Sequence, residues 1–270
     1  MKKRQIFNQI CKDIKSIKIQ GARNIAKEGF RAYNLQPTKS SKQKLLSLRP
    51  TEPMLQNVLN LAEKQTPIKQ IIQHFDDAQQ SINENTLKII KSKDIIFTHC
   101  HSTNVTQALI YSKKKNFQVY NTETRPLYQG RKTAKELSKE KIKITMFTDS
   151  ALGVALEKRQ GTKKATKVFL GADALTKKGI INKIGSKPIA QIAHQQKIPV
   201  YIIADSWKFT KEDLPIEQRD LNEVWDNAPK NIKIKNPAFE FLPKKYITKI
   251  ITEHGTQSYN NFIKTISKIN

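Results

Sequence analysis

Cysteine is almost absent from this sequence of 270 residues, in which Cys11 and Cys100 are the only two. Two thiols are too few for a disulfide framework or for a four-thiolate zinc site. Glycine is also scarce, with 9 residues, and the sequence has no glycine-rich dinucleotide fingerprint, P-loop or metal-binding motif. We therefore predict no metal and no cofactor, and any thiol chemistry must use Cys11 or Cys100.

Long apolar runs are missing as well. The longest run in the C-terminal half, residues 198–204, is far shorter than the roughly 20 residues that a membrane-spanning helix needs. The N-terminus is basic, but Asn8, Gln9 and Lys12 interrupt the apolar core that a signal peptide would need. We therefore expect no membrane association and a cytoplasmic location.

Arginine is the scarcer basic residue, with 8 arginines against 41 lysines in a chain of formal charge +26. Dedicated readers of nucleic acid usually rely on arginine, whose guanidinium binds phosphates and bases bidentately. The lysine clusters are spread along the chain, and most of them indicate solvated surface. The charge favours a phosphorylated partner over a neutral one, but it does not separate a sugar phosphate from RNA. Nucleic-acid binding is therefore a minor alternative that only the charge supports.

The first third of the chain has helical periodicity. Apolar residues recur three or four positions apart, as in Ile6, Ile10 and Ile14. Prolines and short polar residues near positions 37, 50–53 and 66–67 divide this part into four predicted helices, the last ending at about residue 91. We predict a helical N-terminal domain over residues 1–91.

Residues 92–270 have a different pattern, in which short apolar runs alternate with helix-length amphipathic segments. Strands are predicted at residues 94–98, 117–120, 142–147, 167–170 and 199–204, with a further strand at 246–251 and a helix at 259–269 in the tail. This alternation predicts an α/β chain whose C-terminal domain is a Rossmann-like parallel sheet flanked by helices. Ligands of such sheets bind beyond the carboxyl ends of the strands. The residues that follow each strand are therefore the candidate site.

Cys100 follows the first predicted strand, in the segment Thr98-His99-Cys100-His101-Ser102. A thiol at a strand-to-helix turn lies near a helix N-terminus, whose dipole lowers the thiol pKa and favours the thiolate. The alternative is that Cys100 is simply a small buried residue. His99 and His101 share one face of a strand, but no neighbouring carboxylate or second cysteine completes a metal site. We interpret both histidines as structural or solvent-facing.

Asp173 follows the fourth predicted strand. A carboxylate at the end of a buried strand is paired, protonated or functional, because an isolated buried charge is costly. Lys183 is the expected partner, and Asn182 with Lys183 precedes a predicted helix start that suits an anion. Lys208 follows the fifth strand and belongs on the same rim.

Two other strand ends carry weaker signals. Asp149 or Ser150 is predicted to be the N-cap of a helix that begins at residue 151. Arg125 and Arg131 lie close together in the loop after the second strand. A structural Glu–Arg pair and an anion site explain that loop equally well.

The strand ends thus supply one thiol, one carboxyl group and several cations. This set suits cofactor-free acid–base chemistry on a phosphorylated small molecule. A thiol and a carboxyl group on opposite sides of a carbon centre can move protons between neighbouring positions, as in an aldose–ketose isomerase.

Ordered motifs occur along nearly the whole chain: Ile19-Gln20-Gly21-Ala22-Arg23, Arg49-Pro50-Thr51, Thr98-His99-Cys100, Glu123-Thr124-Arg125-Pro126, Gly171-Ala172-Asp173, Asn182-Lys183-Ile184-Gly185 and Lys208-Phe209. Together they resemble one superfamily. It contains the archaeal ribose-1,5-bisphosphate isomerases, the methylthioribose-1-phosphate isomerases and the regulatory subunits of the eukaryotic translation-initiation exchange factor. The regulatory subunits generally lack the cysteine or replace the aspartate. The retained Cys100 and Asp173 therefore favour the enzymes, and residues 207–209 and 236–237 look most like the ribose-1,5-bisphosphate branch.

The resemblance implies an isomerase that converts ribose 1,5-bisphosphate to ribulose 1,5-bisphosphate in nucleoside monophosphate salvage. It implies that Cys100 and Asp173 carry the proton transfers, with the acid and the base unassigned and both an enolate and a hydride route open. It also implies substrate contacts from both domains, namely Gln20, Gly21, Ala22, Arg23, Arg49, Ser102, Thr103, Asn104, Asn182, Lys183 and Lys208.

Two alternatives stand beside this function. One is a methylthioribose-1-phosphate isomerase. The other is a non-catalytic regulator of translation initiation, which Gln20 supports because the enzymes often carry arginine there. The resemblance further implies a homo-oligomer, either a dimer or a hexamer.

Overall fold

The N-terminal part of the chain is entirely helical in the computed structural model, which describes residues 3–269. Residues 1, 2 and 270, at the outer limits of the two predicted domains, lie outside the described residues. The helices are α1 (Lys3–Lys15), α2 (Ala22–Leu35), α3 (Lys39–Leu48), α4 (Pro53–Glu63) and α5 (Ile68–Leu87). The prediction of four helices was wrong, because the first predicted helix is two.

The extra break lies between α1 and α2. Ile17 has a left-handed φ of 63° and Gly21 has a φ of 82°, so the chain turns before α2 begins at Ala22. A β-branched residue in that region is uncommon, and no proline marks it, which is why the break is hard to foresee. The other breaks were predicted. The Thr38 side chain caps α3 by accepting from the Ser41 amide, and Pro53 occupies the first turn of α4.

The rest of the chain is built on a mainly parallel sheet, which confirms the predicted α/β class. Its strands are β1 (Ile95–Thr98), β2 (Gln118–Thr122), β3 (Lys143–Phe147), β4 (Lys167–Leu170), β7 (Val200–Ile203), β9 (Lys249–Thr252) and β10 (Gly255–Gln257). They lie in the order β10-β9-β7-β4-β1-β2-β3, and only β10 is antiparallel to its neighbour. The strand order therefore reverses between β1 and β4, which is the ligand-binding position of a Rossmann sheet.

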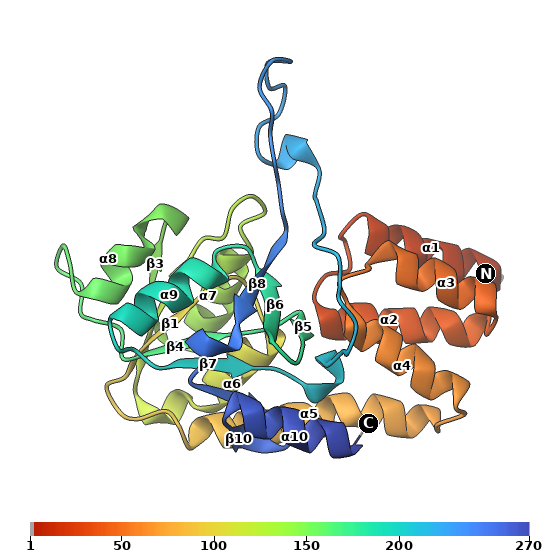
Figure 1. Cartoon of the computed structure of the whole chain (residues 1–270), viewed down its shortest axis with the longest axis horizontal. Helices are drawn as coiled ribbons and strands as arrows, with labels where there is room; N and C mark the ends of the chain where they lie inside the picture. The colour runs from red at the N-terminus through yellow and green to blue at the C-terminus, as the bar shows by residue number, and fades with distance from the viewer. Residues whose placement is uncertain (1–2, 270) are drawn as a thin grey trace.

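Helices cover both faces of this sheet. One face packs against α5, α6 (Thr103–Tyr111) and α7 (Gln129–Lys139) through a core that includes Ile82, Leu109 and Leu137. The other face packs against α8 (Leu152–Glu157), α9 (Ser186–Gln195) and α10 (Tyr259–Ile269). Figure 1 shows the helical domain beside the sheet, with the long helix α5 running beneath both. The proposed division at residues 91 and 92 falls between α5 and β1.

A second, antiparallel sheet of three strands was not predicted. It consists of β5 (Ala174–Leu175), β6 (Gly179–Lys183) and β8 (Phe239–Pro243) in the order β5-β6-β8. The predicted strand at 246–251 begins later, at Lys249, because Lys244–Tyr246 form the 3-10 helix η5. The remaining 3-10 helices are η1 (Lys113–Lys115), η2 (Asp149–Ala151), η3 (Ser206–Lys208) and η4 (Leu221–Glu223).

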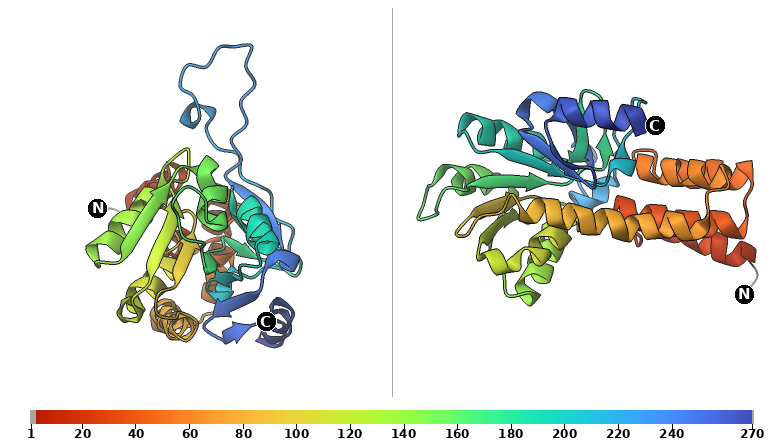
Figure 2. Two further views of the ribbon diagram at one scale, coloured as in Figure 1. Left: turned by 90° about the vertical axis from the view of Figure 1, so that its left-hand side faces the viewer. Right: turned by 90° about the horizontal axis from the view of Figure 1, so that it is seen from below.

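Residues 211–238 form an arm that projects from the body of the molecule, as both Figure 1 and Figure 2 show. At its base Thr51 Oγ1 donates to the Pro215 carbonyl, and Arg49 Nε donates to Glu217 Oε2 over 3.1 Å. These contacts fasten the arm to the helical domain. Within residues 3–269, no helix has the length and apolar character needed to cross a membrane.

Candidate active site

A cavity lies between the helical domain and the carboxyl ends of the strands. Its empty volume is about 1010 Å³, part of it open to solvent, and every predicted site residue lines it. Cys100 follows β1 and Asp173 follows β4, so the two flank the point where the strand order reverses. Parallel strands end at one edge of a sheet, and this geometry is why residues far apart in sequence meet here.

Hydrogen bonds hold the backbone of Cys100 from both sides. Its amide donates to Thr124 Oγ1 over 3.0 Å, and its carbonyl accepts from Thr133 Oγ1 over 2.9 Å. The residue has a left-handed φ of 66°, a conformation that is costly for a side chain with a Cβ. The surrounding contacts therefore fix this strained turn and with it the direction of the thiol.

Asp149 supports the same turn and is not a helix cap, so that prediction was wrong. Its carboxylate accepts from the amides of Thr124 and Arg125, over 2.8 and 2.6 Å. The 3-10 helix η2 and helix α8 begin without any side-chain cap, Ser150 included. The loop after the neighbouring strand β2 binds the carboxylate, and the sequence around Asp149 cannot reveal a competing contact with another segment. The chain of contacts from Asp149 through Thr124 positions Cys100.

Burial dominates the chemistry of the Cys100 thiol. It raises the pKa of Cys100 to about 11, against the opposing effect of Lys183 and with a smaller contribution from Asp173. The expectation of a lowered thiol pKa was therefore wrong. The helix dipole acts only near the helix terminus, whereas the loss of water around a thiolate costs more. At neutral pH Cys100 is a thiol that can give up a proton, not a resting thiolate.

Alkylation of Cys100 should follow this pKa. With iodoacetamide, we expect the rate of modification to rise about tenfold for each pH unit between pH 7 and pH 9, because only the thiolate reacts. Peptide mass spectrometry separates Cys100 from Cys11, which is buried in the helical domain. A rate at Cys100 that is already maximal at pH 7 would show that a thiolate is present and would contradict this assignment.

Asp173 is surrounded by cations but paired with none of them. Burial raises its pKa, while Lys208, Arg49 and Lys183 lower it, in that order. Among residues 3–269, no side-chain nitrogen of a lysine, arginine or histidine lies within 4 Å of the Asp173 carboxylate oxygens. Lys183 is therefore not the direct partner that we expected. Lys183 is itself buried and forms no ion pair within the described chain. Both groups are left available to a ligand.

The helical domain contributes the N-terminus of α2 and two arginines. Gly21 precedes α2 and caps it without a side chain, so the first amides of the helix remain free for an anion. Arg23 lines the cavity while its guanidinium binds Asp76 over 2.5 Å. Arg49 is almost completely buried between Glu52 and Glu217. The two arginines are therefore oriented by carboxylates of this chain.

The start of α6 forms the opposite wall. Ser102 caps the helix, and Gly171 lies so close that a Cβ there would be 2.5 Å from Ser102 Oγ. Lys208 Nζ donates to the Ala172 carbonyl over 2.7 Å and to Asn104 Oδ1 over 3.3 Å. The Asn104 side chain thus helps to position Lys208. Asn182 is similarly engaged, because its amide donates to Ser186 Oγ.

The histidines next to Cys100 are satisfied structurally, as predicted. His99 Nε2 donates to the Ile184 carbonyl, while Nδ1 accepts from Thr122 Oγ1. Burial lowers the pKa of His99, and it lowers the pKa of His101 to about 4, so both rings are neutral. The two loop arginines are structural as well. Arg131 binds Glu123 over 2.9 Å, and Arg125 donates to Tyr128 and to the Val224 carbonyl.

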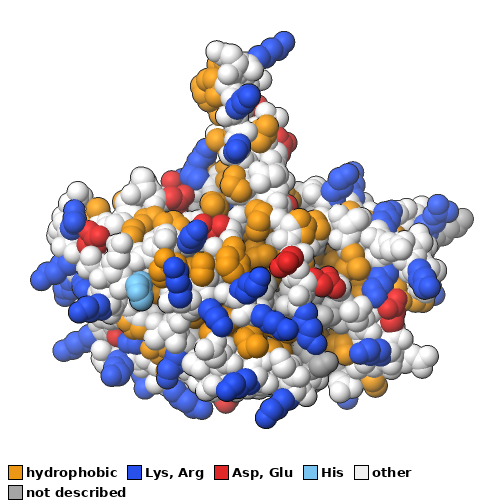
Figure 3. Space-filling view, in the orientation of Figure 1, with side chains coloured by type: hydrophobic (Ala, Val, Ile, Leu, Met, Phe, Trp, Pro, Cys, Tyr) orange, Lys and Arg blue, Asp and Glu red, His pale blue; other side chains and the backbone are white. Residues whose placement is uncertain are grey.

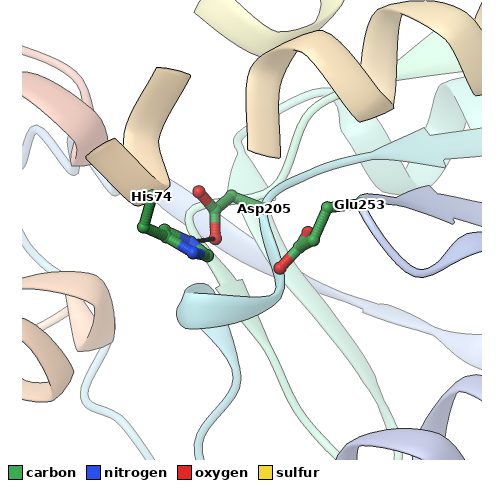
Figure 4. Close-up of side chains that lie close together, drawn as sticks. All are labelled: His74, Asp205 and Glu253. Atoms are coloured by element: carbon green, nitrogen blue, oxygen red, sulfur yellow. Dashed lines mark hydrogen bonds and ion pairs between the residues drawn. The ribbon is translucent and has the colours of Figure 1, made fainter. Parts of the chain in front are cut away.

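A group of polar side chains supports the turn that carries Lys208. His74, Asp205 and Glu253 come together from α5, from the end of β7 and from the turn after β9 (Figure 4). Asp205 accepts from the Trp207 amide and Glu253 from the Ser206 amide, while His74 stacks on the Trp207 ring at 3.5 Å. These contacts connect η3 to α5 of the helical domain. They therefore fix the position of Lys208, which is the last residue of η3.

The sequence reasoning missed several lining residues, including the polar residues Asn24, Glu52, Gln129, Lys132 and Arg219. The sequence signal that could have identified Glu52 is its position directly after the Arg49-Pro50-Thr51 motif. Arg219 comes from the arm, and nothing in the local sequence links the arm to the cavity.

A model of the initiation factor 2 subunit family matches residues 35–258. The chain belongs to this family. Among its relatives, the ribose 1,5-bisphosphate isomerase of Methanocaldococcus jannaschii is 34% identical, with 94% of this chain and 92% of that protein covered. The methylthioribose-1-phosphate isomerase of Koribacter versatilis is 36% identical, but the match covers 67% of this chain and 57% of that protein.

A solved structure has the same fold. It is that of the translation initiation factor eIF-2B from Pyrococcus horikoshii OT3, with a TM-score of 0.80, 26% identity and coverage of 93% of this chain and 96% of that one. The family therefore includes proteins named for sugar-phosphate isomerisation and proteins named for translation initiation. The chemistry of the cavity must decide between them.

Proposed function

We propose that this chain isomerises ribose 1,5-bisphosphate to ribulose 1,5-bisphosphate, an intramolecular oxidation–reduction. The observation that carries the proposal is the position of Cys100 and Asp173 on either side of the strand-order reversal, in one cation-rich cavity. The identity to a protein named ribose 1,5-bisphosphate isomerase, over nearly the full length of both chains, supports it.

The reaction needs one acid and one base. In the substrate, C1 carries both the ring oxygen and a phosphate. Ring opening adds a proton to the ring oxygen, and formation of the ketone removes the proton from O2 and moves the hydrogen of C2 to C1. The acid therefore loses one proton and the base gains one in each turnover. The Cys100 thiol and the Asp173 carboxyl group, each with a raised pKa, are our proposed pair.

The cavity also suits a substrate with two phosphates. Six lysines and arginines line it, against two acidic residues. The free amides at the N-terminus of α2 and those at the N-terminus of α6 lie in opposite walls, one in each domain. We propose that Gln20, Gly21, Ala22 and Arg23 with Arg49 bind one end of the sugar phosphate. Residues 102–104 with Asn182, Lys183 and Lys208 bind the other.

The test compares two substrates. Purified protein is supplied with ribose 1,5-bisphosphate or with methylthioribose 1-phosphate, and the ketose product is quantified. We expect kcat/KM to be at least about a hundredfold higher for the bisphosphate, because the second phosphate adds charge-assisted hydrogen bonds. Preference for the methylthio sugar would overturn the proposed substrate. A protein that isomerises neither sugar would overturn the proposed enzyme and support a non-catalytic binding protein.

We also propose that the chain self-associates through its arm. Residues 211–238 hold six acidic and five basic residues, so the arm has almost no net charge while the rest of the chain carries the whole positive excess. The arm has exposed apolar side chains, including Leu221, Val224 and Trp225. Figure 3 shows hydrophobic side chains on the surface of the arm. An arm of this kind suits the basic body of a second copy.

Light scattering after size exclusion tests the arm. We expect the wild type to be an oligomer and the double substitution Val224→Glu with Trp225→Glu to shift it to the monomer. Ile68→Glu, at an exposed apolar residue on α5, is the matched control and should leave the mass unchanged. An arm variant that keeps the wild-type mass would place the interface elsewhere.

A further inference from the structure

Glu52 is a buried carboxyl group in the wall of the cavity that the proposed chemistry does not use. It precedes Pro53 at the start of α4 and is only 3% exposed. Its Oε1 accepts from Arg49 Nη2 over a long 3.4 Å, and its Oε2 is buried without any partner within residues 3–269. A buried, unpaired carboxyl oxygen is costly, so it indicates a polar group that can pair with a ligand in the cavity.

The neighbouring charges do not neutralise Glu52. Arg49 also donates from Nε to Glu217 Oε2 over 3.1 Å, so one arginine serves two carboxylates. Of the other charged groups that act on Glu52, Asp173 opposes its ionisation and Lys208 favours it. Lys208 is itself bound to the Ala172 carbonyl and to Asn104. Three acidic groups, Glu52, Asp173 and Glu217, therefore act on one another near two cations that already have partners.

This arrangement decides the protonation of Glu52. Burial, followed by the charge of Asp173, raises the pKa of Glu52 to about 8. Below that pH the group is a neutral carboxylic acid, and a protonated carboxyl oxygen is a hydrogen-bond donor. Sugar phosphates present mainly acceptor oxygens, and a carboxylate would repel them whereas a carboxylic acid would bind them.

We propose that Glu52 is a second functional carboxyl group of the site, whose unpaired Oε2 donates a hydrogen bond to an acceptor oxygen of the bound sugar phosphate. Its role rests on the proposed function and extends it, because it adds a donor from the helical domain beside Asp173. Glu52 is a binding and positioning residue in this scheme. It does not exchange protons with the reacting carbons.

The experiment measures binding without turnover. Ribose 1,5-bisphosphate is titrated by calorimetry into the full-length Cys100→Ser protein, as the parent, between pH 6.5 and 9. Two variants are made in the same parent, Glu52→Gln and Glu52→Ala. Glu63→Gln is the matched control, because Glu63 lies on the same helix but outside the cavity and pairs with Lys42.

We expect Glu52→Gln, which keeps a donor, to bind within about threefold of the parent at pH 7. Glu52→Ala should bind about tenfold or more weakly, the loss of one hydrogen bond to a charged acceptor. The sign of the pH effect follows from the pKa, since the donor is present below about pH 8 and is lost above it. Parent binding should therefore weaken by about tenfold between pH 7 and pH 9. Glu52→Gln should flatten that dependence, and Glu63→Gln should leave it unchanged.

The outcomes separate this inference from the proposed function. Equal affinities and equal pH profiles in the parent and both Glu52 variants would overturn the role of Glu52, whatever the enzyme does. If Glu52→Ala does not fold, the pH profile of Glu52→Gln decides alone. A pH dependence lost in Glu52→Gln, with a wild type that does not isomerise the bound sugar, would support Glu52 and overturn the isomerase. A parent that does not bind ribose 1,5-bisphosphate would overturn both.

Discussion

Replacement of Asp173 by asparagine is expected to lower kcat for ribose 1,5-bisphosphate by a factor on the order of 10³, with KM changed by less than about threefold. Asparagine has nearly the same shape, but it cannot exchange a proton, and a positioned acid or base contributes about 10² to 10⁴ in rate. Since no ion pair within residues 3–269 holds the Asp173 carboxylate, the substitution should leave the wall of the cavity intact. Steady-state kinetics and a thermal melt measure both effects.

The control for this variant is Asp77→Asn. Asp77 lies on α5, exposed to solvent, and accepts from Gln73. The Asp77→Asn protein should keep the wild-type kcat and KM. Cys100→Ser should lose as much activity as Asp173→Asn, and the double variant should lose little more, because groups that act as a unit are not additive. A kcat for Asp173→Asn within tenfold of the wild type would remove Asp173 from the chemistry.

Replacement of Lys167 by methionine is expected to lower the free energy of unfolding by about 3 kcal/mol. Lys167 Nζ lies 2.7 and 2.6 Å from the two oxygens of Asp94, and both side chains are nearly buried at the start of β4 and β1. Removal of one partner leaves a buried charge uncompensated, which costs roughly 3–5 kcal/mol in proteins. Asp94 keeps hydrogen bonds from the Lys91 amide and Thr166 Oγ1, so we expect the lower end. Urea denaturation measures the change.

Two variants make that test specific. Lys164→Met, at a surface lysine bound only to the Gln196 carbonyl, should change the unfolding free energy by less than about 0.5 kcal/mol. Asp94→Asn added to Lys167→Met should recover most of the loss, because no unpaired charge remains. A Lys167→Met protein as stable as the wild type would show that the pair contributes nothing.

The part of the site that could be predicted from sequence follows from strand periodicity. Cys100, Asp173 and Lys208 each follow an apolar run, and parallel strands bring such positions to one edge. The helical-domain residues came only from the family resemblance, since periodicity cannot say which helix end faces a distant sheet. Burial, a property of the whole fold, reversed the expected shift in the pKa of Cys100.

The parts that could not be predicted depend on contacts between distant segments. Glu52 becomes informative only when Arg49 is seen to be shared with Glu217 of the arm. Asp149 has the local signature of a helix cap, yet it binds two amides after β2. The turn at Ile17 carries no proline, and its left-handed φ is uncommon for a β-branched residue. For Asp149, a contact with another strand end overrides a local preference that the sequence displays correctly.

The most direct test of the account is a carbon-13 NMR time course with ribose 1,5-bisphosphate labelled at C2. The account predicts that the wild-type protein converts the C2 signal to that of a ketone. The Cys100→Ser, Asp173→Asn double variant should bind the sugar and leave the signal unchanged. A wild-type protein that binds the bisphosphate but leaves C2 unaltered would contradict the account and show that this cavity recognises a ligand without transforming it.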